Sequence, residues 1–191
     1  MTAQALEEII VDGVLYDLMS RPLDAYLDTL NPCPNMADLS GFHCSALWRG
    51  YIGVWELQAD RLFLQRLRGG WPFDEGVVVP DIDLDRIFPD GPRPIPAIWY
   101  SGKLRLPLGP MLQYVHMGWG SFYQFERIIY VHHGRVARVR HVDHTARFLA
   151  ACDAARLFEP RENVEGCGPL HWLTDEGREV WDEFENIRTH V

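Results

Sequence analysis

The feature that most constrains the fold is a series of short apolar segments separated by tight-turn residues. Asp12-Gly13 lies between two such segments, and this dipeptide is the strongest short-range signal of a β-hairpin. His133-Gly134 separates another pair in the same way. The pattern predicts four hairpins, whose segments are 9–11 with 14–16, 51–57 with 61–67, 98–100 with 104–106 about Ser101-Gly102-Lys103, and 128–131 with 136–142. Strands connected in this way form antiparallel sheets.

Helical patterns come only at the end of the chain. Residues Ala146 to Leu157 are alanine-rich, with apolar side chains spaced for one buried face, and Asp143 or Thr145 can cap the start. Thr174 can cap a second helix that runs to about Ile187. The prediction is an α+β fold in one globular domain, residues 1–191, with a predominantly antiparallel sheet or a partly closed barrel of hairpins and two C-terminal helices. The stretches 31–45 and 69–96 are predicted to be loops, because both are rich in proline and glycine.

Composition supports a packed core and argues against a membrane span. Hydrophobic residues make up 47% of the 191 residues, which is ample for a core. No apolar run approaches the roughly 18 residues that a membrane helix needs. The first eight residues contain two glutamates and no apolar stretch of signal-peptide length. We therefore expect a cytoplasmic protein with free thiols.

The charge is unevenly distributed along the chain. The formal net charge is −9, from 27 acidic and 18 basic residues. Residues 1–95 have a balance of −8, residues 96–158 a balance of +5, and residues 159–191 a balance of −6. Because nucleic-acid binders usually carry a basic excess, a nucleic-acid partner is not expected, although the cluster of Arg135, Arg138, Arg140 and Arg147 leaves a local phosphate contact open. Two alternatives remain for a protein of this charge: the segments neutralise each other, or an acidic face stays exposed and attracts a basic partner.

Metal and cofactor motifs are incomplete. The four cysteines and eight histidines lack the paired spacing of a closed zinc site. Asp81, Asp83 and Asp85 imitate the start of a calcium loop, but Arg86 and Pro92 occupy the positions that need glycine and glutamate. No metal site and no cofactor are predicted.

Nucleophile motifs are incomplete as well. Ser121 follows Gly118-Trp119-Gly120, but Tyr123 replaces the last glycine of a G-x-S-x-G elbow. An enzyme, hydrolase-like, remains the alternative hypothesis, with His116, Glu56 and Tyr51 as its site residues.

The densest functional signal is the stretch from Tyr114 to Tyr123. Two glycines among aromatic residues permit a tight backbone path, and the stretch matches neither a Walker nor a Rossmann phosphate loop. Packing in the core would explain this composition. The functional interpretation is an aromatic contact surface, since aromatic side chains anchor interfaces. Its binding residues would be Tyr114, His116, Trp119, Ser121 and Tyr123.

Three motifs carry a resemblance to a family of uncharacterised bacterial proteins. They are R-G-Y-x₃-W-E from Arg49 to Glu56, W-Y-x-G-x-L-R-x-P-x-G from Trp99 to Gly109, and Y-V-H-M-G-x-G-S from Tyr114 to Ser121. The order of the motifs is similar to that family over residues 49–136. The resemblance implies a bacterial origin and brings no known activity.

These features favour a small, acidic bacterial protein that acts by binding another macromolecule. The partner is expected to be a protein. The most specific version is an immunity-like or antitoxin role, in which an acidic inhibitor covers the basic site of a toxin, with charge speeding encounter and aromatic residues retaining the complex.

Overall fold

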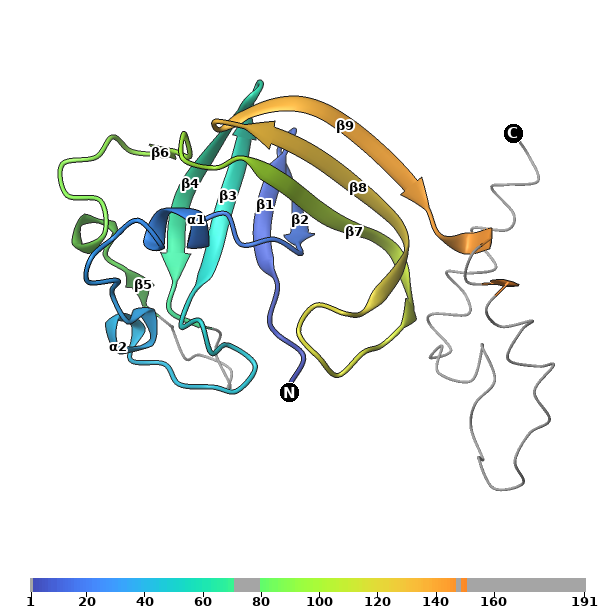
Figure 1. The fold of residues 1–191 in the computed structure, drawn as a ribbon, viewed down its shortest axis with the longest axis horizontal. Coiled ribbons are helices and arrows are strands. Elements are labelled where there is room, and N and C mark those ends of the chain that lie inside the picture. The colour runs from blue at the N-terminus through green and yellow to red at the C-terminus, as the bar shows by residue number, and fades with distance from the viewer. Residues whose placement is uncertain (1, 71–79, 147–148, 151–191) are drawn as a thin grey trace.

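A computed structural model describes residues 2–70, 80–146 and 149–150 of the protein. Within these residues the chain is mostly β, with nine strands in one sheet and two short helices (Figure 1). The strands are β1 (Glu7–Val11), β2 (Val14–Leu18), β3 (Ile52–Gln58), β4 (Arg61–Arg68), β5 (Asp81–Ile82), β6 (Ile95–Pro96), β7 (Gly102–Gln113), β8 (Phe122–His132) and β9 (Arg135–Asp143).

The sheet is mixed, but most of its strand pairs are antiparallel. Its main path has the order β2-β1-β3-β4-β9-β8-β7, while β5 and β6 both pair with β4. The pair β1–β3 is parallel. The predicted predominantly antiparallel sheet is therefore confirmed, and the parallel pair is an addition that the hairpin pattern did not indicate.

Three of the four predicted hairpins form at the turn residues that predicted them. Asp12 and Gly13 have φ values of 53° and 78° and connect β1 to β2. His133 and Gly134 have φ values of 46° and 73° and connect β8 to β9. Positive φ at both central residues is the geometry of the tight turns that match strand twist. The third hairpin joins β3 to β4, with Gln58 opposite Arg61.

The fourth predicted hairpin, between residues 98–100 and 104–106, is wrong. The strand β7 begins at Gly102 and pairs with β8 instead. The Tyr100 amide donates to the Ala97 carbonyl in a turn, and the Tyr100 hydroxyl folds back to the Lys103 carbonyl (2.8 Å). The Trp99 indole donates to Pro22 O (3.0 Å). The side chains of Trp99 and Tyr100 therefore pack against other parts of the fold, and residues 98–100 do not form the predicted strand.

The hydrogen-bonded sheet is open, but its two edges approach each other. Just after β2, the Met19 amide donates to the Arg105 carbonyl in β7 (2.8 Å), and the Ser20 hydroxyl donates to the Lys103 carbonyl (2.8 Å). The sheet consequently curves around one interior. The interior is filled by buried side chains of β1, β3, β4, β7 and β8, among them Ile9, Trp55, Leu64, Leu104 and Ile129.

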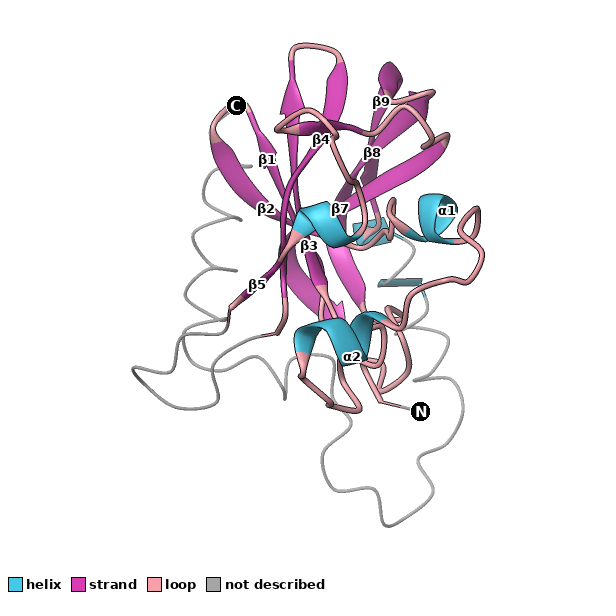
Figure 2. Cartoon of the chain, turned by 90° about the vertical axis from the view of Figure 1, so that its left-hand side faces the viewer, coloured by secondary structure: helices cyan, strands magenta, loops and turns pink. Residues whose placement is uncertain are grey.

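The two helices lie beside the sheet (Figure 2) and were not predicted. The first, α1 (Asp24–Leu27), contributes Leu27 to the core. The second, α2 (Met36–Ser40), falls in the predicted loop, where Asn35 caps its start and Gly41 ends it with φ 66°. The two predicted C-terminal helices lie almost entirely outside the described residues, although the Asp143 side chain accepts a bond from the Thr145 amide (2.8 Å).

Candidate functional site

Three segments far apart in sequence meet at one end of the sheet, the lower end in Figure 1. The Gln4 amide donates to the Gly118 carbonyl (2.9 Å), and the Ala5 amide donates to the Ala46 carbonyl (2.8 Å). The N-terminal segment therefore lies between the connection that precedes β3 and the connection between β7 and β8. We call the surface formed by residues 2–5, 41–50 and 114–121 the end surface.

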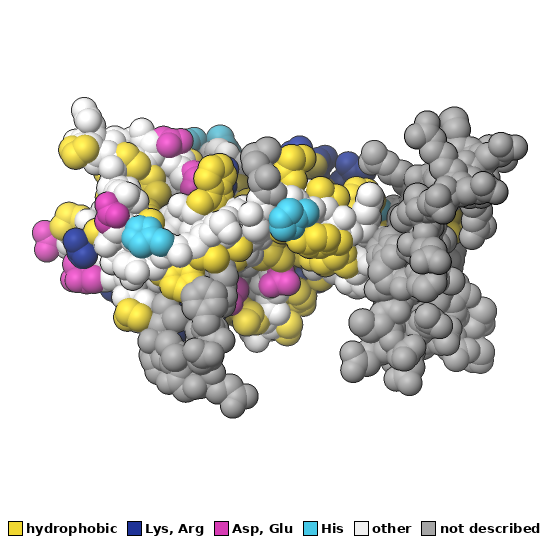
Figure 3. All heavy atoms as spheres, turned by 90° about the horizontal axis from the view of Figure 1, so that it is seen from below, with side chains coloured by type: hydrophobic (Ala, Val, Ile, Leu, Met, Phe, Trp, Pro, Cys, Tyr) yellow, Lys and Arg dark blue, Asp and Glu magenta, His cyan; other side chains and the backbone are white. Residues whose placement is uncertain are grey.

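Large apolar side chains are exposed on the end surface. Trp48 is 71% exposed, Tyr114 57% and Met117 52%. Figure 3 views this end and shows hydrophobic and histidine side chains, several Asp and Glu side chains of the surrounding segments, and Lys and Arg near the margins. Arg49 is the only charged residue in the three segments, and its side chain is buried. The end surface is thus apolar and almost uncharged, in contrast to the chain as a whole.

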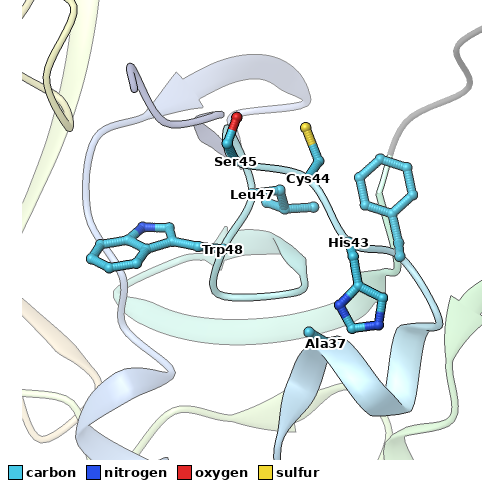
Figure 4. A pocket seen from close by; sticks show the side chains of 7 residues that line it. Ala37, His43, Cys44, Ser45, Leu47 and Trp48 are labelled. Atoms are coloured by element: carbon cyan, nitrogen blue, oxygen red, sulfur yellow. The ribbon is translucent and has the colours of Figure 1, made fainter. Parts of the chain in front are cut away.

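A surface pocket of about 420 Å³ adjoins Trp48. Its lining residues come from α2 and the following loop, and they are Ala37, Phe42, His43, Cys44, Ser45, Leu47 and Trp48 (Figure 4). His43 and Cys44 are neighbours in sequence, but their side chains point in different directions in Figure 4. The pocket therefore offers a mixed apolar and polar recess, without a thiol–imidazole pair.

The five predicted binding residues form an exposed group, Tyr114 and His116, and a partly buried group, Trp119, Ser121 and Tyr123. Tyr114 and His116 point outward and contact each other, with 2.9 Å between the Tyr114 hydroxyl and His116 Nδ1. Ser121 closes the loop, because its hydroxyl accepts a bond from the Val115 amide (3.2 Å). Trp119 is half-buried and its indole donates to the Ala5 carbonyl (3.2 Å). Tyr123 is also half-buried, and burial, followed by the Asp17 charge, raises its pKa.

A buried ionic cluster lies beneath the end surface. Glu7, at the start of β1, is fully buried, and its Oε2 accepts a short bond from the Trp55 indole (2.6 Å). Arg49 Nε lies 3.5 Å from Glu7 Oε1, an ion pair without hydrogen-bond alignment. The Arg49 guanidinium also lies 5.5 Å from the ring centroids of both Tyr51 and Trp119. Trp119 thus anchors the loop 114–121 to this cluster.

The ionisation of the cluster is strongly perturbed. Burial raises the pKa of Glu7 to about 8, although the Arg49 charge and the Trp55 hydrogen bond act in the opposite direction. Burial also lowers the pKa of Arg49. The Tyr51 hydroxyl donates to Asp24 (2.9 Å), and burial raises the pKa of Tyr51 well above its usual value. Desolvation therefore dominates here, as expected for charges removed from water.

The residues of the alternative enzyme hypothesis have separate partners. Tyr51 bonds to Asp24, His116 contacts Tyr114, and Glu56 accepts bonds from Gln58 (2.9 Å) and Gln65. Tyr51 and Glu56 are five residues apart in extended chain, about 16 Å. The structure does not join these three side chains in one site.

Glu7 and Trp48, which belong to the candidate site, were not among the predicted site residues. For Glu7 a signal existed: it has the same strand parity as Ile9 and Val11, so its side chain shares their buried face. For Trp48 no local signal was available, because its exposure depends on how the loop 41–50 packs against the N-terminal segment.

Neither metal sites nor membrane helices are evident in the described part of the chain. No three of its His, Cys, Asp and Glu side chains are grouped so that they could hold a metal ion. None of its helices is long and apolar enough to cross a membrane. Cys33 and Cys44 are free thiols.

Comparisons with known proteins add no family assignment. No family model, curated protein or solved structure matches the chain. The resemblance over residues 49–136 stays a prediction.

Proposed function

We propose that the protein acts by binding another protein through the end surface. The observation that carries the proposal is the exposure of Trp48, Tyr114 and Met117 on two distant loops that both bond to the N-terminal segment, at an end with no exposed charged side chain in its three segments. Interface centres are depleted in charge and enriched in aromatic residues and methionine. Contiguous exposed apolar patches on soluble proteins commonly mark interaction sites.

The pocket beside Trp48 supports the same proposal. At about 420 Å³ it can accept a side chain of a partner, and Trp48 would pack along its rim. Anchoring side chains that fill pockets dominate the binding energy of many complexes. The pocket and the exposed aromatics therefore belong to one recognition surface.

An immunity-like, toxin-neutralising role is the most specific form of the proposal. The net charge of −9 would speed encounter with a basic toxin, and the uncharged end surface would hold the complex once formed. A bacterial origin and a cytoplasmic location are part of this proposal. No shared site supports the alternative, an enzyme with His116, Glu56 and Tyr51.

The test compares two variants of the full chain in the producing bacterium. Trp48→Ala combined with Tyr114→Ala removes two exposed aromatics from the end surface. Leu15→Ala is the matched control, since Leu15 is 58% exposed on β2, beside the Asp12-Gly13 turn. We expect a stoichiometric protein partner whose affinity falls about 30-fold or more in the double variant and is unchanged in the control.

The remaining outcomes of this experiment each decide part of the proposal. If no stoichiometric protein partner is captured, or if both variants retain it equally, binding through the end surface is wrong. If the partner inhibits growth when produced alone, and co-production of the wild type but not of the double variant restores growth, the toxin-neutralising form is supported. A partner without toxicity would refute that form only.

A further inference from the structure

A row of unpaired cations crosses the strands β7, β8 and β9. Tyr130 in β8 lies opposite Lys103 in β7 and opposite Arg138 in β9. One step further along the same face, Arg140 lies opposite Ile128. Side chains directly opposite each other share one face of a sheet. Lys103, Tyr130, Arg138 and Arg140 therefore form one surface, which we call the basic face (Figure 1 shows the three strands side by side).

The cations of the basic face converge on one phenol. The Arg138 guanidinium lies 4.3 Å from the centroid of the Tyr130 ring, and the Lys103 ammonium lies 5.7 Å from it. The pKa of Tyr130 is lowered, first by hydrogen bonding to Arg138 and further by the charges of Lys103 and Arg138 and by Arg140. This surface therefore favours negative charge at the position of the Tyr130 hydroxyl.

No acidic partner offsets these cations within the described residues. None of the ion pairs there includes Lys103, Arg138 or Arg140. The neighbouring arginines differ: Arg105 pairs with Glu126 (2.6 Å), and Arg135 pairs with Asp60 (2.5 Å). Three adjacent positive charges without a counter-ion repel one another, and a bound anion would remove that repulsion.

We propose that the basic face binds the phosphoryl group of a small ligand, with Lys103, Arg138, Arg140 and the Tyr130 hydroxyl as its contacts. Guanidinium groups bind phosphate oxygens through paired hydrogen bonds, and an ammonium adds a third charge. The end surface plays no part in this site. The inference therefore goes beyond protein binding and stands independently of it.

A compact anion fits this surface better than a polyanion. The unpaired cations form a small group, because Arg105 and Arg135 on either side are neutralised by carboxylates. The chain has a net charge of −9, which repels an extended polyanion such as a nucleic acid. A single phosphoryl group can be bound by these three cations alone, without an extended row of basic residues.

The test is a titration of the full chain with inorganic phosphate, followed by ¹H–¹⁵N NMR at constant ionic strength. Phenyl phosphate and a single-stranded oligonucleotide serve as further probes. We expect shifts at residues 103, 130, 138 and 140 with a dissociation constant of roughly 1 mM for phosphate, as suits a few exposed charge-assisted contacts. Phenyl phosphate should bind as tightly or more tightly at the same residues.

Two double variants separate the site from a general charge effect. Arg138→Gln with Arg140→Gln should weaken phosphate binding at least tenfold. Arg86→Gln with Arg93→Gln removes the same formal charge from the connection between β5 and β6 and should leave binding unchanged. The four residues are solvent-exposed, so folding should be preserved, which thermal unfolding checks.

Three results would overturn the inference: no shifts with phosphate or phenyl phosphate, equal weakening by both double variants, or an oligonucleotide bound a hundredfold more tightly than phenyl phosphate. The last result would assign the face to nucleic acid. None of these results bears on the end surface, so each proposal can fail without the other.

Discussion

Two arginine–tyrosine contacts, one just before β3 and one between β8 and β9, lie in opposite surroundings. Arg49 lies 5.5 Å from the ring of Tyr51 in the interior, where Glu7 is its ionic partner. Arg138 lies 4.3 Å from the ring of Tyr130 on the outer face, where no carboxylate partner is described. Burial raises the pKa of Tyr51, whereas the Arg138 contact lowers that of Tyr130. The buried Arg49–Tyr51 contact thus stabilises the interior, whereas the exposed Arg138–Tyr130 contact leaves positive charge available for a ligand.

The buried Arg49 contact is also connected to the end surface. Arg49 packs under Trp119, and Trp119 holds the loop that exposes Tyr114 and Met117. A change in the buried pair should therefore reach the end surface. A change on the basic face should not, because that face lies on β7 to β9 and has its own contacts.

The largest effect should come from breaking the buried pair. Above about pH 8, where Glu7 is ionised, Arg49→Met removes the cation from the buried Glu7 carboxylate, so we expect the free energy of unfolding to fall by about 4 kcal/mol. Arg138→Met, the matched change on the basic face, should stay within about 0.5 kcal/mol, because exposed side chains contribute little. Urea denaturation of both variants at one pH measures the contrast. Equal losses of unfolding free energy in the two variants would show that the buried contact stabilises the fold no more than the exposed one does.

The pH dependence of stability should report Glu7 directly. Its folded pKa of about 8 lies above the ordinary 4.5, so the folded protein binds this proton more tightly. The stabilisation is complete below about pH 4.5 and is lost as the pH rises through 8. Relative to Glu7→Gln, whose amide stays neutral, the wild type should lose about 3 kcal/mol between pH 5 and pH 8.

Denaturant melts of both proteins at several pH values measure this difference. The Gln variant keeps an oxygen that can accept the Trp55 indole hydrogen bond, so the comparison isolates ionisation. Parallel pH profiles for the two proteins would contradict the raised pKa.

Gly53 should tolerate no larger side chain beside the cluster. A Cβ at Gly53 would lie 2.5 Å from both Glu7 Oε2 and Trp55 Nε1. Gly53→Ala should therefore cost about 2 kcal/mol through overpacking. The loss is measured by urea denaturation, and tryptophan fluorescence should shift because the Trp55 indole must move. A variant as stable as the wild type would mean that this corner is less tightly packed.

Local turn chemistry explains how much of the fold was predictable. Asp12-Gly13 and His133-Gly134 specify their hairpins because positive φ is needed within two residues. The signals of α2 were also local, an Asn35 cap and Gly41, but the nearby prolines favoured a loop. The parallel pairing of β1 with β3 joins segments about forty residues apart, and no short pattern encodes it.

The candidate site was predictable only in part, for the same reason. The stretch 114–123 was identified from its composition, and two of its aromatics do face outward or contact the N-terminal segment. Its pairing with residues 2–5, and theirs with residues 41–50, are long-range contacts. The failed hairpin at 98–106 shows the opposite case, in which tertiary packing of Trp99 and Tyr100 overrides a local strand signal.

The smallest effect should be seen in the titration of Tyr130 itself. Because its pKa is lowered while that of Tyr51 is raised, Tyr130 should deprotonate before Tyr51 as the pH increases. The near-ultraviolet absorbance of phenolate follows this titration, and Tyr130→Phe should remove the earliest step. Arg138→Gln should delay that step, since it removes the cation nearest the ring. Tyr51→Phe should leave it in place. If Tyr130→Phe instead leaves the earliest step unchanged, the cations do not lower the pKa of Tyr130. The exposed Arg138–Tyr130 contact would then not differ electrostatically from the buried Arg49–Tyr51 contact.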